Sequence, residues 1–282
     1  MQKESTYPDL YIAGDTDTRT LIPGLCMQGY YVLLLRNRAP ENETWFGRRY
    51  YDYSDATLTC CRPGLSQSAV YMKNPLDCRW IVAFRPELFE EAPSEKDLSD
   101  YTFFAYQPQE ALHLSVAETH VLVECIEDIC VELRRPRDQY SSCILARHIG
   151  RILDYTVRFY ERQFITREWA VEKTITAYDH LLRQYMETGQ LRTRGLPDAK
   201  YCADRLRLSE ACLCDMLKQK TGHTHDNYVQ IKRIEIAKCR LTTLKLPLQQ
   251  IVTDLGFPSI QYFNYLFKKL TGCSPNGCEF PN

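Results

Sequence analysis

Residues 255–275 have the sequence LGFPSIQYFNYLFKKLTGCSP, and this stretch decides the fold of the C-terminal third of the chain. It opens with a Gly-Phe-Pro-Ser break and continues as an apolar and aromatic run that stops at Thr271-Gly272. Ser259 can cap a helix here, because its hydroxyl accepts an unpaired backbone N–H. Gly272 can end it, because glycine adopts the left-handed conformation found after many helices. The stretch therefore predicts a short helix with a defined start and end.

The same pattern occurs a second time, 50 residues earlier. The matching positions are Asp204 and Asp254, Ser209 and Ser259, Leu213 and Phe263, Leu217 and Phe267, and Lys218-x-x-Thr221-Gly222 and Lys268-x-x-Thr271-Gly272. Repetition at a fixed offset indicates two copies of one supersecondary unit. Each copy has a short apolar helix (201–206 and 248–255), a tight turn and a capped second helix, which is the helix-turn-helix pattern. A single helix over about 225–243 would hold two such reading helices roughly one DNA turn apart.

Polar side chains on the second helix of the later copy are the predicted DNA contacts. Phe263 and Phe267 are four residues apart and face the partner helix, so the polar residues of the other face point outward. Asparagine and glutamine can form two hydrogen bonds with an adenine edge, and lysines can neutralise phosphates. The outward residues are Ser259, Gln261, Tyr262, Asn264, Tyr265, Lys268 and Lys269.

The stretch GFPSIQYFNYLFKKLTGCSP resembles the signature of the AraC/XylS family of transcription regulators. That pattern is a Gly-Phe turn, Ser, a Tyr/His-Phe pair, Phe-Lys-Lys, Thr-Gly and Ser-Pro. The upstream copy, LRLSEACLCDMLKQKTGHTHDNYV, also matches, so the resemblance covers about residues 197–282. FGRRYYDYS, ALHLS and FYERQFITRE resemble, less specifically, family members with a cupin-like N-terminal barrel and trailing helices. The resemblance implies a regulator that binds double-stranded DNA, responds to a small-molecule effector and, if it activates, contacts RNA polymerase.

The chain departs from the family pattern at several positions. Tyr265 stands where the family often has arginine, and Cys278-Glu279 replaces the usual Tyr-Arg ending. In the first copy, the positions that usually face bases hold Ala211, Cys214 and Asp215. An aspartate repels phosphate unless it accepts a hydrogen bond from cytosine N4, so we expect the first copy mainly to position the protein. The predicted contacts of the first copy are Ser209, Cys214, Asp215 and Lys218.

The front half of the chain has strand patterns first and helix patterns afterwards. Short aromatic or β-branched runs, separated by Pro and Gly, predict the strands of a barrel or sandwich at 30–36, 45–54, 56–64 and 78–88. Apolar residues every three or four positions then predict helices over 115–134, 139–163 and 171–189. With the resemblance, the expected fold class is α+β, with a small cupin-like β-barrel and trailing helices before an all-α double helix-turn-helix.

These patterns also predict how the chain is divided. We expect a cupin-like sensor and dimerisation domain over 1–165, a linker helix over 166–190, and the double helix-turn-helix over 191–282. Two of the helices between about 139 and 188 carry uninterrupted apolar stripes. The stripes could form one more core layer or a dimer face, and we expect a homodimer that forms through these helices.

Composition is typical of a globular protein, with 44% hydrophobic and 25% charged residues. The sequence has neither a run of about 18 apolar residues nor an apolar secretory segment, so we expect a cytoplasmic protein without a membrane span. Residues 1–167 carry a net charge of −5 and residues 168–282 a net charge of +4, and a basic C-terminal part favours nucleic acid as its partner. The 13 cysteines are expected to be reduced and mostly small core residues.

Two alternative functions and one additional site are considered. A cupin enzyme would hold a metal with histidines of the barrel, but the first histidine, His113, lies beyond the last predicted strand, so we expect no metal, no cofactor and no enzyme activity. A redox-sensing regulator would use Cys60-Cys61, although a vicinal disulfide strains the backbone. An effector pocket in the barrel is compatible with DNA binding, and its candidate residues are Tyr30, Trp45, Trp80 and Phe84.

Overall fold

A computed structural model divides the chain into two compact units, Met1–Ala170 and Val171–Asn282. The structure describes residues 4–7, 9–14, 18–37, 53, 55–64, 78–90, 96–244 and 246–275. The strand predicted at 45–54 lies outside these residues, apart from Tyr53. Within the described ranges, none of the helices has the length and apolar character needed to cross a membrane. The domain boundaries expected at residues 165 and 190 remain predictions.

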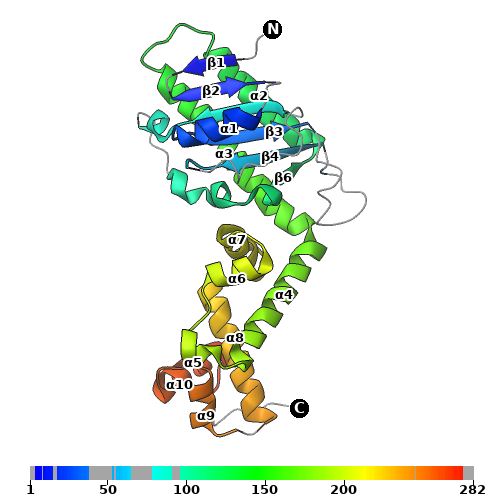
Figure 1. Ribbon diagram of the computed structural model, residues 1–282, viewed down its shortest axis with the longest axis vertical. Helices are drawn as coiled ribbons and strands as arrows, with labels where there is room; N and C mark the ends of the chain where they lie inside the picture. Colours follow the sequence, from blue (N-terminus) through cyan, green and yellow to red (C-terminus); the bar gives the residue numbers. More distant parts are fainter. Residues whose placement is uncertain are drawn as a thin grey trace. The chain divides into compact units, whose positions relative to one another are not determined.

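The first unit is built on an antiparallel sheet (Figure 1). Its strands in the described residues are β1 (Glu4–Tyr7), β2 (Leu10–Ala13), β3 (Tyr31–Arg36), β4 (Ala56–Cys61), β5 (Cys78–Phe84) and β6 (Leu112–Leu114). They lie in the order β1-β2-β5-β3-β4-β6, and every neighbouring pair is antiparallel. Over the residues that the structure describes, β1 and β6 form opposite edges and the sheet is open. The predicted closed, cupin-like barrel is therefore not confirmed.

Successive side chains of each strand point to opposite faces of the sheet. The two faces are covered by different elements. Helix α1 (Thr18–Met27) lies in front of the sheet in Figure 1, and its Cys26 packs in one buried cluster with Val32 and Ile81. The other face carries aromatic rings. Phe84 stacks on Tyr31 with centroids 5.7 Å apart. This aromatic face is continued by the short 3-10 helices between residues 86 and 110 and by helix α3 (Ser141–Thr166).

Two long helices follow the last strand. They are α2 (Val116–Glu132) and α3 (Ser141–Thr166), and they confirm the helices predicted at 115–134 and 139–163. α2 begins with a capping box, in which the Ser115 hydroxyl accepts the N–H of Glu118 and the Glu118 carboxylate accepts the N–H of Ser115. Arg162 of α3 then pairs with the same Glu118 carboxylate at 2.8 Å. The start of α2 is therefore fixed to α3.

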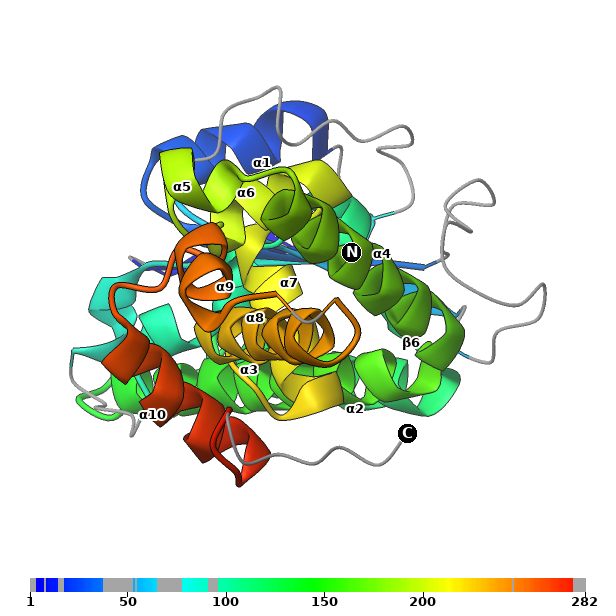
Figure 2. The same ribbon diagram turned by 90° about the horizontal axis from the view of Figure 1, so that it is seen from below.

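The second unit is all helical in the part that is described, which confirms the predicted double helix-turn-helix. Its helices are α4 (Glu168–Glu187), α5 (Gln190–Arg194), α6 (Ala199–Leu206), α7 (Glu210–Thr221), α8 (His225–Thr242), α9 (Leu248–Asp254) and α10 (Ile260–Thr271). α6 with α7 and α9 with α10 are the two helix-turn-helix pairs, and α8 is the connector. Figure 2 shows α9 and α10 beside α8, which both helices contact.

Candidate nucleic-acid interface

The helix predicted from residues 255–275 is α10, and both of its ends are built as the sequence indicates. The Ser259 hydroxyl accepts a hydrogen bond from the backbone N–H of Tyr262 at 3.0 Å. At the other end, Gly272 has a φ of 80° and donates its N–H to the carbonyl of Lys268 at 2.9 Å. Local groups thus satisfy backbone atoms that the ends of a helix leave unpaired.

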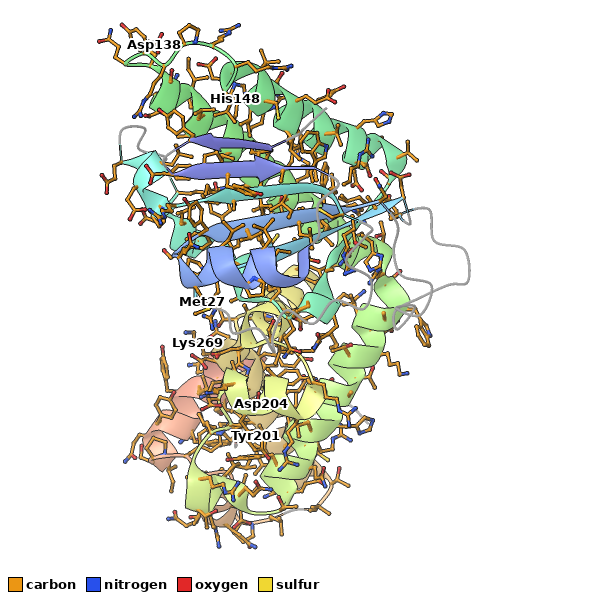
Figure 3. All side chains as sticks on the ribbon, turned by 45° about the horizontal axis from the view of Figure 1, so that its top comes forward. Met27, Asp138, His148, Tyr201, Asp204 and Lys269 are labelled. Atoms are coloured by element: carbon orange, nitrogen blue, oxygen red, sulfur yellow. The ribbon has the colours of Figure 1, made fainter. Side chains whose placement is uncertain are left out.

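α10 buries one face and exposes the other. Phe263, Leu266 and Phe267 are buried, and the Phe263 ring packs edge-on against Phe257 of the preceding turn, with centroids 5.0 Å apart. The aromatic residues of this face are therefore core. The predicted contacts Gln261, Tyr262, Asn264, Tyr265, Lys268 and Lys269 are exposed, as is Leu270, while the cap Ser259 is half-buried; Lys269 is labelled in Figure 3.

The exposed face of α10 has the chemistry that DNA reading requires. With 3.6 residues per turn, Gln261, Tyr265 and Lys268 lie opposite the buried face, and Asn264 lies beside them. Two side-chain amides can bond base edges, and two ammonium groups can contact phosphates on either side. Tyr265 is 62% exposed and contributes a ring and a hydroxyl to the same surface. The structure thus brings together the residues predicted for the second copy.

α7 of the first copy has the same ends as α10. The Ser209 hydroxyl accepts the N–H of Cys212 at 3.1 Å, and Gly222 follows the helix with a φ of 73°. Ser209 itself is buried, so its main role is to cap α7. Of the other predicted contacts in α7, Lys218 is exposed, while Cys214 and Asp215 are half-buried.

The surroundings of Cys214 are acidic. Burial raises the pKa of its thiol, and the carboxylates of Glu210, Asp215 and Asp226 raise the pKa further. Phosphate oxygens would meet these same carboxylates if α7 entered a groove as deeply as α10. The first copy therefore carries a surface that is less suited to DNA than that of the second.

The two copies do not align with one constant offset. Arg207 in the first turn and Gly256 in the second have φ values of 58° and 67°, and these left-handed positions are 49 residues apart. The caps Ser209 and Ser259 are 50 residues apart. The second turn is therefore one residue longer, and Pro258, directly before the cap, occupies the additional position.

This shift corrects one part of the predicted repeat. Asp204, which is exposed and labelled in Figure 3, corresponds to Thr253, so its predicted match with Asp254 is wrong. Asp254 has a role of its own in the second copy. It forms ion pairs with Arg192 of α5 and with Arg240 of α8, the latter at 3.7 Å. Nothing in the sequence periodicity indicated this role, because it joins residues 62 positions apart.

The short helix α5 also contacts the second turn directly. Leu191 is buried, and a Cβ placed on Gly256 would lie 3.4 Å from its Cβ and from its carbonyl oxygen. Glycine at this position therefore allows both the left-handed backbone and the close approach of α5. The turn that leads into α10 is held from the side of α5 as well as from α8.

The connector α8 is fixed to α4 by a group of polar side chains. The Tyr178 hydroxyl lies 2.9 Å from Nδ1 of the buried His225, whose Nε2 lies 3.0 Å from the carbonyl oxygen of Pro197. The Tyr228 hydroxyl donates to Asp179 at 2.8 Å, and burial together with this carboxylate raises the pKa of Tyr228 to about 12. No sequence pattern indicated this network, because His225 lies 47 residues from Tyr178.

The residues proposed for an effector pocket are not brought together. Tyr30 belongs to the buried cluster beneath α1. Trp80 and Phe84 lie on the other face of the sheet, because they alternate along β5 with Ile81 of the α1 cluster. Trp45 lies outside the described residues.

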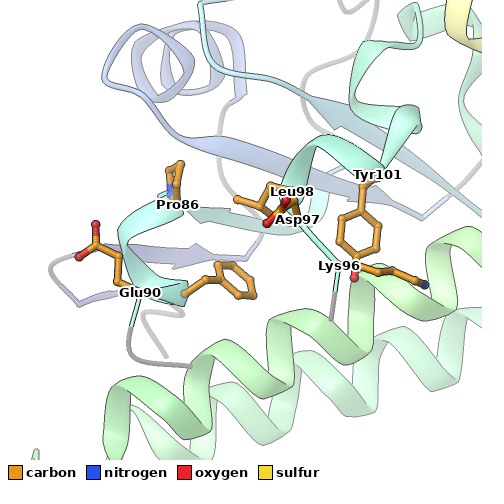
Figure 4. Close-up of a pocket in the computed structure, with 7 residues that line it drawn as sticks. Pro86, Glu90, Lys96, Asp97, Leu98 and Tyr101 are labelled. Carbon is orange, nitrogen blue, oxygen red and sulfur yellow. The ribbon is translucent and has the colours of Figure 1, made fainter. Parts of the chain in front are cut away.

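A pocket of about 370 Å³ lies elsewhere in the first unit, beside the 3-10 helices (Figure 4). It is lined by Pro86, Phe89, Glu90, Lys96, Asp97, Leu98 and Tyr101. The Lys96 ammonium pairs with Asp154 at 3.2 Å, and the Tyr101 hydroxyl donates to the same carboxylate at 3.3 Å. Burial, and after it the Asp154 carboxylate, raise the pKa of Tyr101 to about 12.

Cys60 and Cys61 are not placed as the redox pair that the alternative function would need. Cys60 and Cys61 are neighbours in β4, so their side chains point to opposite faces of the sheet, and only Cys61 belongs to the α1 cluster. Burial raises the pKa of the Cys60 thiol well above its usual value, which disfavours the reactive thiolate. Most described cysteines are free, as expected, but Cys273 is disulfide-bonded, so the expectation of reduced thiols is wrong there. Among the described residues, no group of three or more His, Cys, Asp and Glu side chains is placed to hold a metal ion.

Comparison with known proteins identifies the C-terminal unit. Residues 202–278 match a helix-turn-helix domain family. The chain is 33% identical over 86 residues to the arabinose operon regulatory protein of Escherichia coli (strain K12), which is 29% of this chain and 30% of that protein. It is 32% identical over 77 residues to the HTH-type transcriptional activator RhaR of the same strain, which is 27% of each. The chain thus spans about a third of the length of the curated relatives it matches.

Two solved structures are also similar. The C-terminal domain of AraT, a response regulator from Geobacillus stearothermophilus, shares 26% identity over 37% of this chain and 91% of that chain, with a TM-score of 0.29. Unsaturated fatty acid bound wild-type ToxT from Vibrio cholerae strain SCE256 shares 16% identity over 98% of this chain and 95% of that chain, with a TM-score of 0.31.

Proposed function

We propose, from the premise that residues 202–278 form a helix-turn-helix domain of the AraC type, that the whole chain is a transcription regulator that binds double-stranded DNA. Its relatives through this domain are named as a regulatory protein and a transcriptional activator. We therefore propose no enzyme activity. Such a protein acts where the chromosome is, which places it in the cytoplasm.

The observation that carries this proposal is the exposed face of α10. Gln261 and Asn264 can bond base edges, and Lys268 and Lys269 can neutralise phosphates, while the apolar residues of the same helix are buried. We propose α10 as the main reading helix. α7, with Cys214 and the acidic groups around it, contributes position more than sequence readout.

The first unit would then sense an effector and join two copies of the chain. The apolar stripes that predicted a dimer are buried within the chain, for example at Ile149 of α3 and Leu182 of α4. A dimer would therefore use other surfaces, and the exposed Val131 and Tyr140 at the α2–α3 end are candidates. A dimer would match two half-sites on one face of the DNA. If the protein activates transcription, the partner of the bound dimer is RNA polymerase.

Selection of binding sites by the full chain tests the proposal. Random double-stranded DNA would be incubated with the protein, and the bound fraction sequenced over successive rounds. We expect one enriched motif and a specific affinity about 10³-fold or more above that for scrambled DNA. Sedimentation of the same protein at tens of micromolar (roughly the range where weak dimers form) checks the dimer. A protein that enriches no sequence would contradict the proposed function.

A further inference from the structure

Arg233 is the largest fully buried side chain of the described residues, with an exposed fraction of 2%. It lies on the connector α8. Its Nε and Nη2 atoms donate to the carbonyl oxygen of Leu255 at 3.1 and 2.8 Å, and its Nη1 donates to Oε1 of Gln230 at 2.8 Å. The guanidinium carbon lies 3.8 Å from the centroid of the Phe257 ring. A buried cation is thus held by a backbone carbonyl, an amide oxygen and an aromatic ring.

The carbonyl that Arg233 binds lies at a decisive point of the second copy. Leu255 is the residue that ends α9, directly before the left-handed Gly256. The last carbonyls of a helix lack partners within the helix and carry the negative end of its dipole. A guanidinium presents two parallel donors in a rigid plane, so it fixes the direction of this carbonyl as well as its distance.

The same arginine is connected to α10 through two rings. Phe257 lies between the guanidinium and Phe263, whose centroid is 5.0 Å from that of Phe257. Phe263 in turn packs against Phe267 at 5.5 Å. Since both phenylalanines of α10 face away from the exposed reading residues, a shift of Phe257 would move or rotate that helix.

Burial of a cation is costly, and it lowers the pKa of Arg233 to about 10. An apolar residue would fill the space at less cost, but it would not fix the direction of the Leu255 carbonyl. We propose that Arg233 is a positioning residue of the DNA-binding unit, which sets the seating of α10 in the major groove by holding the end of α9 and the turn that follows. This inference rests on the proposed function of α10.

The test uses the full chain and the DNA duplex that the wild-type protein enriches from a random library. Arg233→Lys keeps the charge and loses the planar pair of donors, and Arg240→Met is the matched control, because it removes an arginine of the same helix that contacts the same end of α9. The readouts are melting temperature, affinity for scrambled DNA and affinity for the enriched duplex. For Arg233→Lys we expect discrimination between the two DNAs to fall by about tenfold, a typical effect of one well-placed base contact, with non-specific affinity unchanged. Arg240→Met should retain discrimination within about twofold.

A second variant keeps the test decisive if Arg233→Lys does not fold. Phe257→Leu retains Arg233 and its hydrogen bonds but removes the ring between the guanidinium and Phe263, and it should lower discrimination in the same way. Folded variants of either kind with wild-type discrimination would overturn the proposal. Gln261→Ala separates this outcome from failure of the proposed function. If Gln261→Ala relaxes discrimination and the positioning variants do not, only the role of Arg233 is wrong; if Gln261→Ala has no effect either, α10 is not the reading helix.

Discussion

α7 and α10 have the same caps and the same buried positions but different exposed faces. Each begins at a capping serine and ends at a left-handed glycine, and each buries apolar residues at the same positions, such as Leu213 in α7 and Phe263 in α10. Both exposed faces carry two lysines in the last turn, Lys218 and Lys220 in α7 and Lys268 and Lys269 in α10. The difference lies earlier in the helix, where Gln261, Asn264 and Tyr265 of α10 correspond to Ala211, Cys214 and Asp215 of α7. The repeat therefore preserves the residues that fold the unit and has diverged in those that would read DNA.

The turns of the two copies also differ, both in their residues and in their contacts. The first turn places a non-glycine residue, Arg207, in the left-handed region. The second uses Gly256, adds Pro258 and is held by Arg233 of α8 and by close contact with Leu191 of α5. The turn with more contacts to other helices is thus the one before α10, which carries Gln261 and Asn264. Four substitutions, each paired with a substitution in the other copy, test how far the two copies differ.

The largest expected effect is on the shared core. Phe267→Ala removes a fully buried ring from α10 and should lower the free energy of unfolding of the second unit by about 3–5 kcal/mol. Leu217→Ala is its counterpart in α7 and should cost about 2–5 kcal/mol. Chemical denaturation of the full chain, followed by circular dichroism, measures both. A large loss of unfolding free energy for one variant and none for the other would show that the two buried faces do not contribute alike to stability.

Specificity should respond to one copy alone. Gln261→Ala should cost about 1–3 kcal/mol on the enriched DNA site and relax the preference at one base position, because a bidentate contact is lost. Gln219→Ala removes an exposed glutamine from α7 and should leave every preference unchanged. Quantitative binding to a set of single-base variants of the site decides between them. An equal effect of Gln219→Ala would mean that α7 reads bases too.

The stability of the unit should depend on glycine in the second turn but not in the first. Gly256→Ala should destabilise the unit by about 1–2 kcal/mol, since an L-residue is strained in the left-handed region, and the added Cβ meets Leu191 at 3.4 Å. Arg207→Gly relieves that strain in the first turn, so its net effect should lie within about 1 kcal/mol of zero. Melting temperatures of the two variants give the comparison. A destabilised Arg207→Gly variant would show that the arginine side chain holds the first turn.

The smallest expected effect concerns phosphate contacts. Lys268→Ala should weaken binding to all DNA sequences alike and reduce the slope of log affinity against log salt by about 0.9. Lys218→Ala should reduce the slope by less, because Asp215 is three residues away on the same helix and partly offsets its charge. Titrations of scrambled DNA at several salt concentrations measure both slopes. Equal reductions would indicate that α7 approaches the backbone as closely as α10.

The sequence predicted those parts of the fold that depend on periodicity. Helices such as α2, α3 and α10 were found from their apolar spacing and their caps, with ends within a few residues of those observed. α1 was missed, because Pro23 and Gly24 inside it are residues that normally interrupt helices. β6 has only three residues and carries no alternation that could be recognised.

The site divides in the same way. Exposed residues of α10, among them Gln261 and Lys268, follow from the position of each residue on the helix, and the structure places them on the exposed face as predicted. Arg233 could not be found, because its partner Leu255 is 22 residues away and a charged residue in a helix pattern is normally assigned to the surface. The additional residue in the second turn was missed because short turns have no period to follow.

The contacts of α4 and α5 have a consequence for anyone who prepares the DNA-binding part alone. The match to the helix-turn-helix domain family begins at residue 202, yet His225 contacts Tyr178 and the carbonyl of Pro197, and the turn before α10 contacts Leu191. A fragment cut at the border of the recognisable sequence would expose the buried imidazole and one side of the turn to water. A fragment that starts before α4 would retain both. The border of the family match thus marks the shared domain, whereas the contacts that hold its connector and its second turn begin earlier, in α4 and α5.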